Sequence, residues 1–351
     1  MSTRRHLLEF DAEALRALFV EFGEKPFRAT QVLEWVYDRG AESFAAMTNL
    51  SKLLRDSLAD RLDICTSRIV RRSPSKDGLV KLLLRWPDGA TSECVLIPDG
   101  RRRTACISSQ VGCPVGCLFC ASGVGGFQRN LSTGEIIEQV LRVSAEASAD
   151  DGRLSNVVLM GLGEPLANYD AVLRAVRTIN APWGPNIGAR KITISTVGLP
   201  KQIRRLADEG LQLNLALSLH APAGALRREL IPWASKIPLG ELGAACRYYF
   251  DTTGREVTIE YILLRGVNDK PTQAEELARF ARQFRSNVNL IRYNPVPELP
   301  YDRPTAEEAH AFQQRLRTLG VNAHMRTSRG LDVEAACGQL RRRELEADAC
   351  P

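Results

Sequence analysis

Thr104–Cys120, TACISSQVGCPVGCLFC, decides the fold of this chain, because a short apolar strand leads there directly into a loop with three cysteines. Cys113, Cys117 and Cys120 are separated by three and by two residues. Three thiolates on one short loop can bind three irons of a [4Fe–4S] cluster, which leaves the fourth iron without a protein ligand. An iron with an open coordination site can bind a substrate or cofactor as well as pass electrons.

Two other interpretations of the three cysteines are weaker. A structural zinc ion would require a fourth ligand at matching spacing, and no Cys-x2-Cys or His-x3-His pair follows within the next several dozen residues. Free cysteines are common in protein cores, but Pro114 and Gly116 interrupt this run. We therefore expect an iron–sulfur cluster, with zinc as the main alternative.

Beyond residue 103, strand patterns alternate with helix patterns. The strands are expected at Thr104–Ser108, Asn156–Leu162, Lys191–Thr196, Leu213–Leu219, Val257–Leu264 and Val288–Tyr293. The helices are expected at Thr133–Glu146, Ala171–Ile179, Leu199–Glu209, Leu239–Phe250, Ala274–Phe284 and Ala306–Leu319. Such βα units form a parallel sheet covered by helices, and six are fewer than the eight of a complete barrel. The sequence predicts an α/β fold, a six-unit partial (β/α) barrel open on one side.

The first hundred residues are of a different kind. Helical patterns come first, and two strand patterns that flank the turn Pro87-Asp88-Gly89 follow them. The helices are expected at Phe10–Phe22, Ala29–Tyr37 and Leu50–Leu58. The strands are expected at Leu79–Arg85 and Ser92–Ile97. We expect a small helical N-terminal domain over residues 1–60 and a β-hairpin linker over 61–98. A core over 99–332 and a C-terminal segment over 333–351 complete the expected domain organisation.

Polar residues stand at the carboxyl ends of the expected strands, where sites in parallel sheets lie. They are Gly163 and Glu164 after the second strand, Ser195 in the third, Ser218, Leu219 and His220 at the end of the fourth, and Asn294 after the sixth. Each could belong to an ordinary turn or core. Together they favour a polar cofactor with many hydrogen bonds.

Three further residues have two interpretations each. Glu93 shares a strand face with Val95 and Ile97 by the two-residue period, and the sequence alone favours a position at a sheet edge. Cys106 precedes the cysteine loop, and Cys337 has small neighbours. From the residues alone we interpret both as inert thiols rather than reactive ones.

Composition excludes some classes of protein. The chain has 351 residues, of which 44% are hydrophobic and 25% charged, with no apolar run long enough for a membrane span and no signal-peptide pattern. Its nine cysteines suit a reducing compartment, so we expect a cytoplasmic protein.

The net charge of +6 is unevenly distributed. Residues 68–103 contain nine Lys or Arg against four Asp or Glu, and Arg341–Arg343 form a second basic cluster. Such clusters are typical of a solvated face or of a surface that binds RNA. Charge alone does not separate the two.

Several long motifs in order resemble the RNA adenine C2-methyltransferases of the RlmN type, within the radical S-adenosylmethionine (SAM) enzymes. They are CISSQVGCPVGCLFC, VVLMGLGEPLAN, ITISTVG, LALSLHAP, VTIEYILLRGVND and SRGLDVEAACGQL. The resemblance covers nearly the whole chain, including the helical N-terminal region.

The resemblance implies a role for each matching position. Cys113, Cys117 and Cys120 would bind the [4Fe–4S] cluster, and its open iron would chelate the amino and carboxylate groups of SAM. Residues that would hold the rest of SAM are Gly163, Glu164, Ser195, Ser218, Leu219, His220 and Asn294. The same resemblance reverses the inert interpretation of three residues: Glu93 would be a proton acceptor, Cys337 the methyl carrier, and Cys106 its partner in a transient disulfide.

In the family's mechanism, one SAM methylates Cys337 and a second is cleaved reductively to a radical. That radical takes a hydrogen atom from the S-methyl group, and the resulting carbon radical adds to adenine C2. After loss of an electron and of the C2 proton, to Glu93 or to Cys106, the Cys106 thiolate attacks the sulfur of Cys337 and frees the base. The cofactors carry this chemistry, while the protein positions them and excludes water.

The family's substrates are 23S rRNA and, for many members, the anticodon-adjacent adenine of tRNA. We expect both RNAs as partners, an external electron donor such as flavodoxin, and a monomer without membrane association. The alternatives are the resistance-type methylation of adenine C8, an iron–sulfur electron carrier, and a zinc-bearing RNA-binding module. The chain departs from the family at Trp233 and Ala234, where a branched aliphatic residue and an asparagine are usual, and in its tail, residues 341–351.

Overall fold

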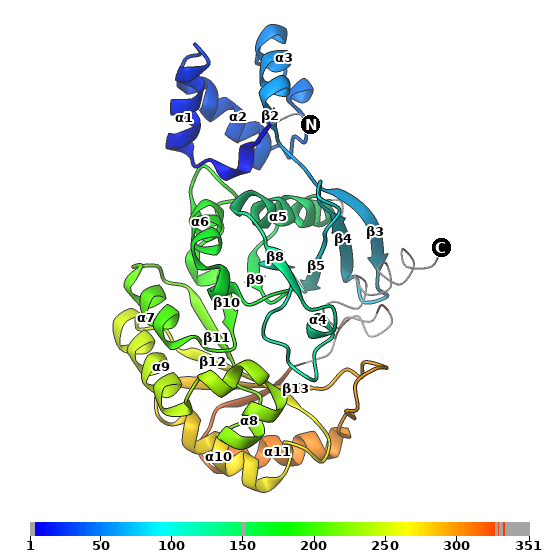
Figure 1. Cartoon of the computed structure of the whole chain (residues 1–351), viewed down its shortest axis with the longest axis vertical. Helices are drawn as coiled ribbons and strands as arrows, with labels where there is room; N and C mark the ends of the chain where they lie inside the picture. Colours follow the sequence, from blue (N-terminus) through cyan, green and yellow to red (C-terminus); the bar gives the residue numbers. More distant parts are fainter. Residues whose placement is uncertain (1–3, 149–151, 327–328, 330–332, 334–351) are drawn as a thin grey trace.

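The computed structural model describes residues 4–148, 152–326, 329 and 333. Its centre is a ten-stranded sheet in the order β14-β13-β12-β11-β10-β9-β6-β5-β4-β3 (Figure 1). Strands β6 and β9 to β14 run parallel to one another and form the curved part of the sheet. This is the predicted α/β partial barrel.

The parallel strands confirm the predicted ones and add another. They are β6 (Arg102–Cys106), β9 (Asn156–Leu159), β10 (Ile192–Thr196), β11 (Asn214–Ser218), β12 (Val257–Leu263), β13 (Ser286–Arg292) and β14 (Ala323–Arg326). The sequence missed β14, because a strand of four residues at the end of the sheet has too short an alternation to stand out.

The predicted helices are also present and cover one face of the sheet (Figure 1). They are α5 (Thr133–Ser148), α6 (Tyr169–Asn180), α7 (Pro200–Asp208), α9 (Leu239–Thr253), α10 (Pro271–Ala281) and α11 (Ala306–Thr318). Two short helices, α4 (Ala121–Val124) and α8 (Gly224–Leu230), lie in loops at the carboxyl ends of strands. The 3-10 turns are Leu7–Glu9, Phe44–Ala46, Pro165–Asn168, Ala189–Lys191 and Pro232–Lys236.

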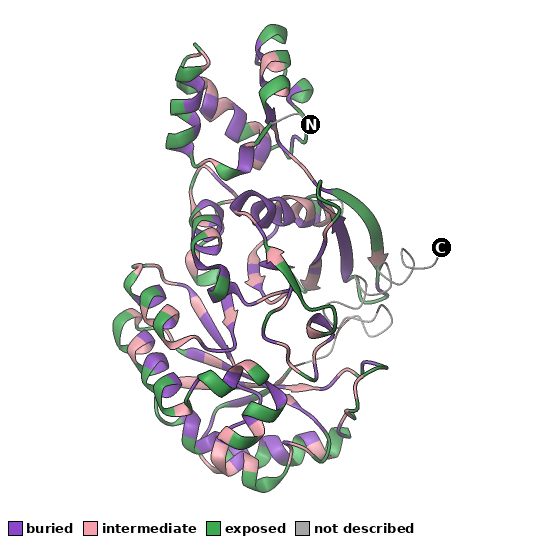
Figure 2. Ribbon diagram, viewed as in Figure 1, coloured by how far each residue is buried: buried purple, intermediate pink, exposed green. Residues whose placement is uncertain are grey.

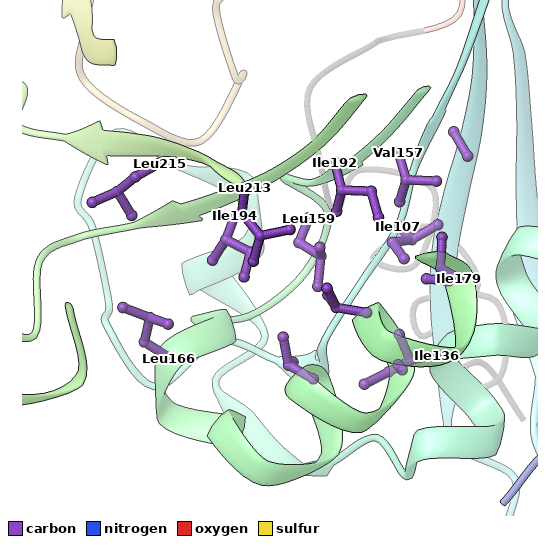
Figure 3. Packing of buried hydrophobic residues seen from close by; sticks show 14 of the residues in the cluster. Ile107, Ile136, Val157, Leu159, Leu166, Ile179, Ile192, Ile194, Leu213 and Leu215 are labelled. Carbon is purple, nitrogen blue, oxygen red and sulfur yellow. The ribbon is translucent and has the colours of Figure 1, made fainter. Parts of the chain in front are cut away.

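The parallel sheet has one apolar and one polar face. Outward side chains such as Val157, Leu159, Ile192 and Ile194 pack against Ile136 of α5 and Ile179 of α6, with other helical residues (Figure 3). The alternate residues of β10 and β13 point to the other face and are less buried, as the mixed colours of the strands show (Figure 2). A sheet buried on both faces would be apolar on both, so the polar face marks an interior that is available for a ligand.

The antiparallel strands continue the same sheet. The predicted hairpin forms as β4 (Val80–Arg85) and β5 (Thr91–Asp99), and β5 pairs with β6 of the parallel part. The sequence missed the edge strand β3 (Arg68–Pro74), which pairs with β4 and is exposed along most of its length. Its arginines obscure the alternation of a strand.

The helical N-terminal unit contains α1 (Ala12–Glu21), α2 (Phe27–Tyr37) and α3 (Lys52–Arg61), with β1 (Arg5–His6) and β2 (Leu62–Asp63) pairing in parallel where it meets the core. Asp11 and Ser51 cap α1 and α3 by accepting from the backbone amides of Ala14 and Leu54.

Carboxylates make several of the contacts between this unit and α5. The Glu9 carboxylate accepts from the backbone amide of Gly134 at 2.8 Å. The buried Glu138 carboxylate accepts from the backbone amides of Thr66 and Ser67 at 2.8 and 2.9 Å, and from both hydroxyls.

No helix in the described parts of the chain is long and apolar enough to cross a membrane.

Candidate active site

The cysteine loop lies at the carboxyl end of the parallel sheet, as predicted. It runs from β7 (Gln110–Gly112) to α4, and β7 pairs with β8 (Phe127–Asn130), which brings the two ends of the segment together. The backbone amide of Cys113 donates to the carbonyl of Gly126 at 3.2 Å, and the amide of Cys120 donates to the carbonyl of Cys117 at 3.2 Å. These bonds hold all three cysteines on one compact loop.

The three thiols of this loop suit a cluster better than a single ion. Burial raises the pKa of the Cys113 thiol to about 12 and that of Cys117 well above its usual value, with Cys120 adding to both shifts. A zinc ion needs four ligands around one centre, whereas a [4Fe–4S] cluster takes one cysteine per iron. The thiolates need the positive charge of metal to be stable here, and the loop fits the iron–sulfur cluster.

The turn after β9 packs directly against the segment that leads to the cysteine loop. A Cβ at Gly161 would lie 2.6 Å from the Ser108 hydroxyl, and one at Gly163 would lie 2.6 Å from Cβ of Gln110. Gly163 also has a φ of +103°, which an L side chain rarely adopts. Close packing and backbone conformation thus both require these glycines.

Glu164 is buried at the end of this turn and joins two strand ends. Its carboxylate accepts from the backbone amide of Leu166 at 3.0 Å and from that of Val197 at 2.7 Å. Burial raises the pKa of the Glu164 carboxyl to about 7, although the hydrogen bonds from Val197, Thr196 and Leu166 oppose the rise. Glu164 positions the rim of the sheet, and each of its oxygens already accepts one bond from the protein.

Ser195 and Ser218 meet on the polar face of the sheet. Their hydroxyl oxygens are 3.2 Å apart, and both residues are partly exposed. Ser195 pairs with Ala216, which is two residues before Ser218 on the neighbouring strand, and Ser218 pairs with Glu260. The two serines therefore point to the same face of the sheet. Two hydroxyls on neighbouring strands can donate to or accept from a polar ligand.

His220 follows β11 and is a neutral imidazole. Its Nδ1 accepts from the backbone amide of Ile262 at 3.1 Å, which leaves the proton on Nε2. Burial, and then the charge of Arg227, lower its pKa to about 3. Its ring meets Phe119 of the cysteine loop edge to face, with centroids 5.0 Å apart. The fourth strand end and the cysteine loop are therefore in contact.

Two other predicted residues lie at the strand ends. Leu219 is fully buried, and its backbone amide donates to the carbonyls of Leu217 and Glu260. Asn294 follows β13, and its side-chain oxygen accepts from Arg303 at 3.2 Å.

Glu93 and Cys106 lie on one face of the sheet. In the register of β5 and β6, Val95 pairs with Cys106, and Glu93 is two residues from Val95. Glu93 is 3% exposed on a strand that is paired on both sides, so the interpretation of Glu93 as an edge residue is wrong. Its strand looked like an edge because the pairing with β6 is not visible in a local pattern. Lys81, which the sequence analysis did not single out, is buried and pairs with Val95 on this same face.

The remaining cysteines that the structure describes lie outside the cysteine loop. Cys94 and Cys246 are fully buried core thiols, and Cys65 is partly buried. Cys337, Cys350 and the basic cluster Arg341–Arg343 lie outside the described residues.

Arg227 is a residue of this region that sequence reasoning missed. It is on α8, 1% exposed, and its Nη2 donates to the carbonyl of Val197 at 2.6 Å. The run Leu-Arg-Arg-Glu contains two adjacent arginines, and nothing in it distinguishes the buried Arg227 from the exposed Arg228.

Two family models match the chain. Residues 5–64 match the "Ribosomal RNA large subunit methyltransferase N-terminal domain" and residues 107–281 match the "Radical SAM superfamily".

Full-length relatives are also similar. A "Probable dual-specificity RNA methyltransferase RlmN" from Thermosynechococcus vestitus is 50% identical over 97% of this chain and 99% of its own length. The protein of that description from Geobacillus kaustophilus is 46% identical over 96% of this chain and 92% of its own. Among solved structures, a radical SAM methyltransferase from Sphaerobacter thermophilus is 46% identical and superposes with a TM-score of 0.93, over 95% of this chain and 98% of that one.

Proposed function

The chain belongs to the RlmN family of radical SAM enzymes, and we propose that it methylates C2 of one adenine in 23S rRNA and of the anticodon-adjacent adenine in tRNA. As a member of this family it is a radical SAM RNA methyltransferase with a [4Fe–4S] cluster and SAM as cofactors. The observation that supports the finer activity most is that Cys106 shares a face of the sheet with Ser195. Cys106 pairs with Val158, and Val158 pairs with Thr193, which is two residues before Ser195. Glu93 and Cys106 therefore lie on the same face as the polar strand ends.

Cys113, Cys117 and Cys120 would hold the cluster. Gly163, Glu164, Ser195, Ser218, Leu219, His220 and Asn294 would line the SAM site at the strand ends. When bound, the cluster supplies the electron for reductive cleavage of SAM, which is chemistry that protein side chains do not provide. The protein's part is to bind and orient SAM, and to keep water from the reacting atoms.

Glu93 and Cys106 would act on the adenine. A carboxylate and a thiol on one buried face can accept a proton and attack a sulfur, respectively. In this proposal Cys337 is the methyl carrier. The Cys106 thiolate attacks the sulfur of Cys337, and the bond between that sulfur and the methylene group on C2 breaks. A disulfide forms, the electron pair of the broken bond stays on the methylene carbon, and this carbon takes up a proton to become the methyl group of the released base. An external reductant such as flavodoxin restores the cluster and the cysteines.

RNA would contact the chain through its basic surface and the helical N-terminal unit. On the exposed strand β3, Arg68 and Arg71 are exposed, as are Arg101 and Arg102 near the turn before β6. Guanidinium groups bind phosphates at this kind of surface. In this proposal residues 1–60 form an accessory RNA-binding domain, 61–98 a hairpin linker, 99–332 the catalytic core and 333–351 the segment with Cys337. The enzyme would be a cytoplasmic monomer.

The direct test is a methylation assay. Protein that is purified and reconstituted without oxygen is incubated with reductant, SAM and unmodified 23S rRNA or tRNA, and the nucleosides are identified by mass spectrometry. We expect 2-methyladenosine. Formation of 8-methyladenosine would contradict the C2 assignment, and an intact cluster with no methylated product would contradict the enzymatic proposal.

Cys106→Ala tests the resolving role. We expect this variant to accumulate a covalent protein–RNA adduct, because no thiolate then attacks the sulfur of Cys337. Cys94→Ala is the matched control, since Cys94 is buried on the neighbouring strand and, by alternation, on the opposite face. Gel electrophoresis under denaturing conditions detects the adduct, and full turnover without an adduct would refute the role.

Cys337→Ala should keep the cluster, as judged from iron content, and leave RNA unmethylated.

A further inference from the structure

Arg227 is a buried cation with unused hydrogen-bond donors. The side chain is 1% exposed, and its Nη2 donates to the carbonyl of Val197 at 2.6 Å. Its Nε and Nη1 atoms are buried and have no hydrogen-bond partner within the described residues. A buried guanidinium with free N–H groups is costly unless an acceptor, preferably an anion, completes it.

The position of Arg227 indicates where that anion lies. Helix α8, which carries Arg227, ends against the cysteine loop, because the backbone amide of Leu118 donates to the carbonyl of Leu230 at 3.0 Å. Val197, which accepts from Arg227, also donates from its amide to Glu164 on the neighbouring strand end. The side chain therefore stands where the cysteine loop meets the rim of the sheet.

The charge of Arg227 also acts on the rim beside the cysteine loop. Burial and then the Arg227 charge lower the pKa of His220, whose ring meets Phe119 of that loop. The guanidinium is thus close enough to this strand end to interact with charge there.

We propose that Arg227 binds the negative charge of the cofactors on the cysteine loop through its free Nε and Nη1 groups. The anion is either a sulfur of the cluster at Cys117 or the carboxylate of SAM, and a guanidinium fork suits both. This inference rests on the proposed role of the three cysteines. It adds a cofactor-binding residue to the site.

The test compares Arg227→Gln with Arg228→Gln, an exposed neighbour on the same helix. Iron and sulfide content is measured first, and Cys117→Ala serves as the variant that loses the cluster. The reduction potential of the reconstituted cluster is then measured by electron paramagnetic resonance without SAM, and the dissociation constant of SAM by equilibrium dialysis. Arg227→Lys is included because it keeps the positive charge if the Gln variant does not fold.

Two results would support the proposal and identify the anion. If the cluster is the partner, the potential of Arg227→Gln shifts to more negative values, because reduction then adds charge without a nearby cation; Arg227→Lys shifts less. If the SAM carboxylate is the partner, the potential without SAM is unchanged and SAM binds about thirtyfold more weakly or worse, since a buried charge pair is lost. In that case Arg227→Lys also binds SAM more weakly than wild type, because it lacks the fork.

Other results would overturn it. If Arg227→Gln retains its cluster and matches Arg228→Gln in both potential and SAM affinity, the inference is wrong while the proposed function stands. If the wild-type protein itself binds no cluster, the cysteine assignment fails and the inference fails with it.

Discussion

His220 combines an uncommon backbone conformation with a neutral side chain. Its φ is +56°, in the left-handed region that is uncommon for residues other than Gly. The ring stays in place through the bond from the Ile262 amide and the edge contact with Phe119, while Asn268 donates to the carbonyl of His220 at 2.8 Å. Protonating the ring would break the bond to Ile262 and bury a charge beside Arg227.

This environment predicts a pH dependence of stability. The pKa of His220 is lowered from 6.5 to about 3 by burial and by Arg227. Above pH 6.5 the ring is neutral in both the folded and the unfolded chain, and its contribution to the free energy of unfolding is fully present. Below that pH the unfolded chain takes up a proton that the folded chain refuses, so the free energy of unfolding falls as the pH approaches 3, by as much as about 4 kcal/mol.

His220→Asn should remove this component, because Asn tolerates the left-handed backbone and does not titrate. Thermal unfolding between pH 7 and pH 4 measures the effect. We expect a smaller loss of stability toward acid than in wild type, and no such change in His310→Asn, which alters an exposed residue of α11. An identical acid dependence of His220→Asn and wild type would contradict the explanation.

At this scale the sequence predicted which residues gather but not what each one does. The polar strand ends follow from the rule that sites lie at the carboxyl ends of parallel strands, and Ser195 and Ser218 do meet there. That Glu164 binds backbone amides could not be predicted, because one of those amides belongs to Val197, which follows a different strand, β10; the other is that of Leu166. Arg227 was missed because its burial depends on long-range packing.

Helix α5 meets the N-terminal unit at a glycine. A Cβ on Gly134 would lie 2.4 Å from Nδ1 of His6 and 3.0 Å from the carboxylate of Glu9. The same glycine donates its amide to Glu9. The second residue of α5 is thus small because another element lies directly against it.

Gly134→Ala should therefore loosen this contact and lower the free energy of unfolding by about 1–3 kcal/mol. Gly240→Ala is the matched control, because Gly240 is also the second residue of a helix, α9, and has open space around it. That change should stabilise by about 0.5–1 kcal/mol. Denaturant unfolding measures both, and equal effects of the two substitutions would contradict the packing argument.

Among the elements, the sequence predicted helices and strands well and their partners less well. Alternating patterns identified β4 and β5 as a hairpin, with Trp86 and Ala90 closing the turn. The pairing of β5 with β6 is not local in the pattern, so the sequence did not predict that the hairpin continues the parallel sheet. The exposed β3 lacks the alternation of a half-buried strand.

For the whole molecule, the attachment of the N-terminal unit depends on Glu138. This carboxylate is fully buried on α5 and accepts from the amides and hydroxyls of Thr66 and Ser67, with Arg142 at 3.3 Å. The segment that it holds connects the helical unit to β3. This buried carboxylate thus holds the segment at which the two parts of the chain are joined.

Glu138→Gln should cost about 3 kcal/mol, because an amide nitrogen would then face N–H and O–H donors of Thr66 and Ser67 that have no other acceptor among the residues that the structure describes. Glu146→Gln is the control on the same helix, where the carboxylate pairs with the half-exposed Arg72; its loss should stay below about 1 kcal/mol. Denaturant unfolding compares the stability of the two variants, and limited proteolysis near residue 65 measures whether that segment is still bound to α5. Equal stability of both variants would show that Glu138 does not hold this segment.

The order of the ten-stranded sheet has a consequence for biosynthesis. From β3 to β14, each strand of this sheet lies beside the strand of the same sheet that comes before it along the chain. A nascent chain can thus add strands to one growing edge as they leave the ribosome, without waiting for a distant partner. Because the loop of Cys113, Cys117 and Cys120 emerges before β9 to β14, its thiols are accessible to an iron–sulfur donor before the curved wall around them is complete.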